Sequence, residues 1–104
     1  MKHTPADIDQ LAFNRTYELF SSRWKVYLLY AIDHSTYRMG ELRRLFPMIS
    51  RVTLTNYLQE LERDGFVERT VYPAPPLRTD YSLTPLGISA LPYLAQLIQW
   101  GATH

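Results

Sequence analysis

The sequence predicts a mainly α-helical domain that carries one β-hairpin, and three observations support this fold class. Apolar residues recur at helical spacing along most of the 104-residue chain. Residues 66–83 instead form two runs of β-forming residues, separated by the proline-rich sequence PAPPLR. The length and the 46% content of hydrophobic residues suit one domain with a small core, so we expect residues 1–104 to form a single unit.

The first two helices are expected over residues 7–22 and 22–32. In the first helix we expect the apolar side chains to turn inward, and these are Leu11, Phe13, Tyr17, Leu19 and Phe20. In the second helix, Trp24, Leu28 and Ile32 recur at helical spacing, which predicts a buried face. The sequence DHSTYR that follows is expected to form a turn.

A short helix is predicted within the sequence MGELRRLFP, residues 39–47. Gly40 is a tolerable N-cap, Glu41 is favourable in the first turn, and Pro47 lies beyond the end.

A longer helix is then predicted over about residues 50–64. Ser50 is a good N-cap, because its hydroxyl can accept a hydrogen bond from a free backbone N–H. Gly65 can take the left-handed conformation that ends a helix. The apolar face of this helix consists of Leu54, Leu58 and Leu61.

The hairpin and the last helix complete the chain. The hairpin spans about residues 66–83, and the three prolines in PAPPLR make its tip stiff. Thr84 followed by Pro85 is an N-cap with proline at the first helical position, which begins a long apolar helix. Pro92 inside this helix predicts a kink. Because two helices joined by a tight turn precede a stiff hairpin, the order of elements predicts a winged helix-turn-helix.

The outward face of the helix over residues 50–64 is a candidate for reading DNA. With its leucines toward the core, Val52 and Asn56 point away, and Thr53 and Thr55 flank that face. Asn56 suits adenine, whereas the methyl groups of Val52 and Thr53 suit a thymine methyl. Ser50 and Arg51, at the start of the helix, suit phosphate.

Basic residues lie close to this helix along the chain. Between Arg38 and Arg51 there are four arginines against one acidic residue, and we expect Arg43, Arg44 and Arg51 to contact phosphates. In the hairpin, Arg69 and Arg78 either contact phosphate or pair with Glu68 and Asp80. Arg78 is the stronger candidate for DNA, since it follows the proline-rich tip.

The chain resembles the HxlR family of bacterial and archaeal winged-helix transcription regulators. The segments that carry the resemblance run from Arg23 to Gly101, and they are RWKVYLLYAI, RMGELRRLFPMISRVTLTNYLQELERDGFVERTVYP, PPLRTDYSLTPLG and ALPYLAQLIQWG. The resemblance implies a homodimer that binds double-stranded DNA and is joined through its terminal helices. The chain departs from the family pattern at Val52, where lysine is common, and at Gln59, where arginine is common. It also has no cysteine near the N-terminus.

The last helix carries more apolar surface than one stripe facing a small core requires. We therefore expect a dimer interface that combines this helix with the N-terminal one. The residues expected there are Leu11, Phe13, Leu91, Leu94, Leu97 and Ile98.

Other kinds of chemistry have little support in the sequence. The absence of cysteine excludes disulfides and thiolate chemistry, and none of His3, His34 and His104 lies at metal-ligand spacing, so we expect no metal. The sequence has no nucleophile elbow, phosphate loop or dinucleotide fingerprint, so we also expect no cofactor and no enzymatic activity. The N-terminus lacks the apolar core of a signal peptide and no run is long enough to span a membrane, which leads us to expect a cytoplasmic location. An aromatic set at helical spacing suits core packing better than a ligand pocket, and it consists of Phe20, Trp24, Tyr27 and Tyr30. The alternative function is a winged-helix adaptor that binds proteins and not DNA.

Overall fold

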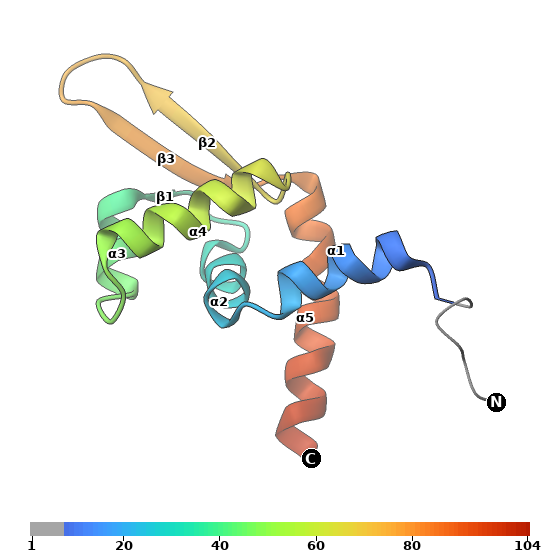
Figure 1. Cartoon of the computed structure of the whole chain (residues 1–104). Coiled ribbons are helices and arrows are strands. Elements are labelled where there is room, and N and C mark those ends of the chain that lie inside the picture. The colour runs from blue at the N-terminus through green and yellow to red at the C-terminus, as the bar shows by residue number, and fades with distance from the viewer. Residues whose placement is uncertain (1–7) are drawn as a thin grey trace.

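The computed structural model describes residues 8–104, so His3 lies outside the described residues. Within the described residues, five helices and three strands follow one another (Figure 1). In order they are α1 (Gln10–Phe20), α2 (Arg23–Ile32), β1 (Tyr37–Arg38), α3 (Met39–Leu45), α4 (Arg51–Arg63), β2 (Val67–Tyr72), β3 (Arg78–Leu83) and α5 (Pro85–Thr103). The predicted winged helix-turn-helix is confirmed: α3 and α4 are its two helices, and β2 and β3 are its wing.

The sheet has one strand that the sequence did not predict. Its order is β1-β3-β2, with both pairs antiparallel. Tyr37 pairs with Tyr81 and Arg38 pairs with Asp80, so the expected turn ends in a short strand that ties the start of α3 to the wing. Because β1 has only two residues, no period-2 pattern could reveal it. The start of α3 also differs from the prediction. Arg38, not Gly40, is the N-cap, and its N–H donates to a carboxylate oxygen of Glu41 over 2.9 Å.

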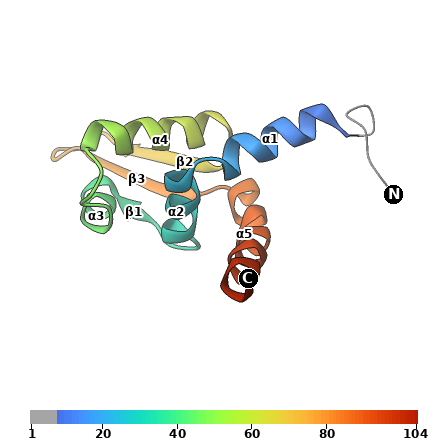
Figure 2. The same ribbon diagram turned by 60° about the horizontal axis from the view of Figure 1, so that its bottom comes forward.

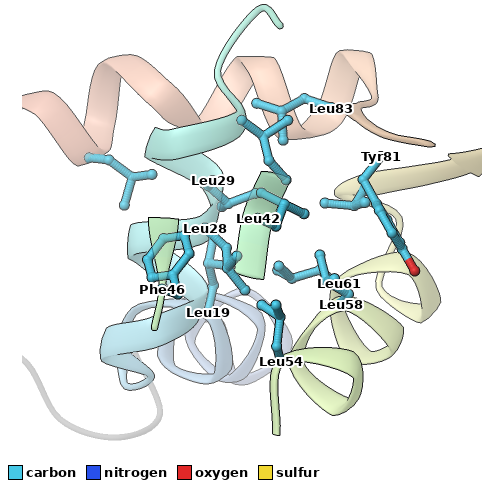
Figure 3. Close-up of a cluster of buried hydrophobic side chains, with 13 residues drawn as sticks. Leu19, Leu28, Leu29, Leu42, Phe46, Leu54, Leu58, Leu61, Tyr81 and Leu83 are labelled. Carbon is cyan, nitrogen blue, oxygen red and sulfur yellow. The ribbon is translucent and has the colours of Figure 1, made fainter. Parts of the chain in front are cut away.

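The core is built from leucines of α2 and α4. Leu54, Leu58 and Leu61 are at most 1% exposed, which confirms the predicted inner face of α4. Figure 3 shows these side chains in one cluster with Leu28 and Leu29 of α2, Leu42 of α3, and Tyr81 and Leu83 of β3. The helix-turn-helix and the wing therefore share one apolar core.

The prediction that the apolar residues of α1 turn inward was wrong for most of them. Leu11 is 74% exposed, Phe13 52% and Tyr17 63%, whereas Leu19 is buried and Phe20 is half-buried. The reason is the direction of α1. The C-terminal end of α1 lies against α2, and its N-terminal part points away from the core (Figures 1 and 2). Among residues 8–104, the exposed side chains of Leu11, Phe13 and Tyr17 do not pack against the core.

The last helix divides its apolar residues between the core and the surface. Leu94 is 1% exposed and packs in the core of its own chain, so its assignment to a dimer interface was wrong. Leu91 is half-buried against the same core, and Leu97 and Ile98 are more than half exposed. The helix is continuous from Pro85 to Thr103, with Pro92 inside it.

Candidate nucleic-acid interface

The α3 helix, the N-terminal end of α4 and the tip of the wing lie at one end of the molecule, whereas α1 and α5 lie at the other (Figures 1 and 2). The fold thus separates the residues expected to contact DNA from those expected to contact a second chain.

The start of α4 is held by the predicted cap. The Ser50 hydroxyl accepts a hydrogen bond from the backbone N–H of Thr53 over 3.1 Å and donates to the Thr53 hydroxyl over 2.9 Å. Thr53 is consequently half-buried, and its side chain has a fixed position beside the cap. The cap leaves the first free N–H groups of the helix pointing outward, where they can meet an anion.

Two side chains stand out from the middle of the exposed face of α4. Val52 is 70% exposed, and Asn56, one turn further on, is also exposed. Thr55 is half-buried at the edge of this face, as Thr53 is. Asn56 offers a donor and an acceptor on one planar group, the arrangement that pairs with an adenine edge.

Three exposed arginines lie on α3 and at the start of α4. Arg43 and Arg44 are exposed on α3, and Arg51 is exposed at the first position of α4. Within residues 8–104, none of the three forms an ion pair. Unpaired guanidinium groups beside a helix N-terminus are well suited to phosphate oxygens.

The wing arginines, in contrast, are paired with carboxylates of the same chain. Arg78 donates two hydrogen bonds of 2.9 Å to Asp80, which is only 5% exposed, and its guanidinium lies 5.2 Å from the centre of the Tyr72 ring. Hydrogen bonds from Arg78 are the main reason that the pKa of Asp80 lies below its ordinary value. Arg69 pairs with Glu62 of α4 over 3.3 Å and not with Glu68. Arg78 therefore forms the expected pair with Asp80, which leaves its guanidinium less available to phosphate than those of Arg43, Arg44 and Arg51.

An ion pair between a buried lysine and a partly exposed glutamate joins α2 to α4. Lys25 of α2 is 7% exposed, and its amino group lies 2.8 Å from a carboxylate oxygen of Glu60 on α4. Neither residue was predicted to be functional, and in the sequence only the position of a lysine within an apolar helix indicates the contact. Loss of Glu60 would leave Lys25 as a poorly solvated charge, so the pair supports the packing of α4 on α2 that the leucine core establishes.

At the opposite end, α1 and α5 enclose an apolar groove of about 850 Å³. Leu19, Phe66 and Trp100 line it, together with Leu97 from the expected interface and Arg15 as its charged residue. Phe13 and Tyr17 stack on each other on α1 outside the lining of this groove. An exposed groove beside exposed aromatic residues is typical of a surface that another protein chain covers.

The described residues lack the features of two other kinds of site. Within residues 8–104, no three His, Cys, Asp or Glu side chains gather in a way that could hold a metal ion. Nor is any helix in that range both long enough and apolar enough to cross a membrane.

A helix-turn-helix with a paired-strand wing, a capped second helix and exposed arginines beside it defines the class of winged helix-turn-helix proteins. Residues 19–104 match the family described as HxlR-like helix-turn-helix. The chain belongs to this family of transcriptional regulators, as its resemblance predicted.

Individual relatives agree with the family assignment. The chain is 37% identical over 94 residues to the HTH-type transcriptional regulator YtcD of Bacillus subtilis, an alignment that covers 90% of this chain and 75% of the relative. Among solved structures, the redox regulator HypR in its reduced form has a TM-score of 0.81 at 36% identity and covers 88% of this chain and 91% of its own. A transcriptional regulator of the MarR family from Porphyromonas gingivalis W83 has a TM-score of 0.83 at 29% identity, with coverage of 98% and 97%.

Proposed function

We propose that the chain is a sequence-specific regulator that binds double-stranded DNA as a homodimer. The N-terminal half of α4 enters the major groove, Asn56 and Val52 contact base edges, and Arg43, Arg44 and Arg51 contact phosphates. The wing lies along the neighbouring backbone, where Arg78 reaches phosphate only if its pair with Asp80 opens or is shared.

The observation that carries this proposal is the contrast between the two arginine sets. Arg69 and Arg78 are paired within the chain, whereas the three arginines around the start of α4 have no carboxylate partner among residues 8–104. Since phosphate contacts position a DNA-binding protein and base contacts specify its site, the unpaired set lies where positioning contacts are needed.

Fluorescence anisotropy with labelled duplexes tests the proposal. A duplex from upstream of the protein's own gene is compared with a random duplex of equal length. Tighter binding to the first, by at least about a thousandfold at physiological salt, is the expected result. Equal affinity for both duplexes, together with failure to enrich any sequence from a randomised library, would mean that α4 does not read sequence.

The apolar residues on α1 and α5 support the homodimer. Leu11, Phe13, Leu97 and Ile98 are exposed, and no segment of residues 8–104 covers them. Two-fold pairing of these helices would bury them and place two copies of α4 about 34 Å apart, one turn of DNA. Leu94 is not part of this proposal, because it is buried within its own chain.

Light scattering at micromolar concentration is expected to give twice the chain mass of 12.2 kDa. Leu97→Asp is expected to lower the mass to that of one chain, because it would place a charge in an apolar interface. The matched control is Leu77→Asp at the wing tip, where leucine is 79% exposed, and it should leave the mass unchanged. A wild-type protein of one chain mass would contradict the homodimer.

Because the chain contains no cysteine, we expect its DNA binding to be insensitive to thiol reagents. Treatment with N-ethylmaleimide is expected to leave the affinity for DNA unchanged, because the chain has no thiol to modify. Any regulation of this protein would then use a non-covalent ligand, a protein partner or its own abundance. Loss of DNA binding after treatment would contradict this prediction.

A further inference from the structure

The end of α4 and the start of α5 share one set of cap hydrogen bonds. The α4 helix ends in a turn in which the N–H of Phe66 donates to the carbonyl of Leu61 over 2.9 Å and the N–H of Gly65 donates to the carbonyl of Glu62 over 3.0 Å. Gly65 has a φ of 86°, the left-handed conformation that this kind of helix end requires. The carbonyls of Gly65 and Phe66 are then free to accept bonds from elsewhere.

Thr84 supplies both of those bonds while it caps α5. Its hydroxyl donates to the carbonyl of Gly65 over 2.5 Å and accepts from the N–H of Gly87 over 3.1 Å. Its own N–H donates to the carbonyl of Phe66 over 3.1 Å. One residue therefore begins α5 and holds the turn that ends α4.

Gly87 allows the two segments to approach this closely. It is buried, and a Cβ atom there would overlap the carbonyl oxygen of Phe66 and lie 3.3 Å from the Cβ of Leu83. Any side chain at this position would push α5 away from the turn after α4. Gly101, in the last turn of the same helix, has no atom within 4 Å of such a Cβ.

We propose that Thr84 and Gly87 are positioning residues that set the distance between the two DNA half-sites read by the dimer. This inference rests on the proposed function, in which α5 joins the two chains and α4 reads the bases. The junction links these helices directly, so it fixes the angle at which each α4 leaves the dimer interface.

A small change of that angle has a large effect at the DNA. The 13 residues of α4 extend about 20 Å from the junction, so a tilt of about 10° moves the N-terminal end of the helix by about 3 Å. That displacement is close to the roughly 3.4 Å between neighbouring base pairs. A loosened junction would therefore let the dimer accept half-sites one base pair nearer or farther apart.

Four variants distinguish the effect of losing the contacts of Thr84 and Gly87 from the effect of a general loss of stability. Thr84→Ser keeps the hydroxyl and both of its hydrogen bonds. Thr84→Asp keeps an acceptor that caps α5 but has no proton to donate to the carbonyl of Gly65, so it is expected to fold with a broken junction. Gly87→Ala forces α5 away from the turn, and Gly101→Ala is its matched control in the same helix.

The wild-type dimer is first used to select its site from a randomised library of double-stranded DNA. Duplexes that carry the selected half-sites at the native spacing, and at spacings one and two base pairs shorter or longer, are then titrated with each variant. Circular dichroism and light scattering establish that each variant is folded and dimeric. The readout is the ratio of affinities between spacings, which a general loss of stability does not change.

Wild type, Thr84→Ser and Gly101→Ala are expected to prefer the native spacing by at least about tenfold, and Thr84→Asp and Gly87→Ala by less than about threefold. If Gly87→Ala does not fold, Thr84→Asp decides the question. Failure of the wild type to select any paired site would overturn the proposed function and this inference with it. A paired site whose spacing preference is the same in wild type and in the folded junction variants would overturn the inference alone.

Discussion

Replacing Leu58 with alanine is expected to lower the free energy of unfolding by about 2–5 kcal/mol. Leu58 is 1% exposed and lies in the cluster where α4 packs on α2 and the sheet (Figure 3). Truncation removes apolar contacts and leaves a cavity that the surrounding leucines cannot fill completely. Urea denaturation, followed by circular dichroism at one protein concentration, measures the change.

The matched control for this variant is Val52→Ala on the same helix. Val52 is 70% exposed, so its truncation should change the free energy of unfolding by no more than about 0.5 kcal/mol. Equal changes for the two variants would contradict the assignment of an inner and an outer face to α4.

Replacing Asn56 with alanine is expected to cost roughly 1–3 kcal/mol of binding free energy for each half-site of the true operator, and little on random DNA. Asn56 is uncharged and exposed on the face that would meet the bases, so its loss removes paired hydrogen bonds without changing the charge. The dependence of affinity on salt should stay unchanged. Equal loss on both duplexes would mean that Asn56 does not read a base.

Neutralising Arg51 should change the salt dependence of binding and not its sequence preference, in contrast to Asn56→Ala. It should weaken binding to every sequence alike and lower the slope of log affinity against log salt by about one unit for each protomer on the duplex. Arg43 and Arg44 are expected to behave in the same way. Arg78 should have a smaller effect because Asp80 already neutralises it. If none of the arginine variants changes affinity, the protein-binding adaptor would replace DNA binding as the proposed function.

Variants of Val52 test whether its side chain contacts a thymine methyl at the position where lysine is common in the family. If its side chain packs on a thymine methyl, alanine should be tolerated better than lysine, because lysine would bring a charge to an apolar contact. The salt titrations used for Asn56 also measure this pair.

The parts of the fold that the sequence predicted are those governed by local rules. Ser50 and Thr84 could be identified as caps because a capping hydroxyl acts within three residues of itself. The inner face of α4 was predictable because its polar residues contrast with Leu54, Leu58 and Leu61.

The parts that were missed depend on contacts between distant segments. Leu94 and Leu97 are the same residue type in one apolar helix, and only the position of α5 on the core decides which of them is buried. The ion pairs between Lys25 and Glu60 and between Arg69 and Glu62 likewise could not be predicted, because each joins residues of two elements that meet only in the folded chain. At the candidate site, the sequence located the arginines but could not show which ones already had carboxylate partners.

The strand order β1-β3-β2 also bears on the solubility of this protein. The β2 strand is paired on one side only, so its other side presents unpaired backbone groups along the edge of the sheet. Such an edge is a place where an extended chain from another molecule can add and begin to aggregate. Here the edge strand has six residues, which is an ordinary strand length, so its protection comes from the exposed charges of Glu68 and Arg69. We expect these two charges to oppose the addition of a second strand to the wing.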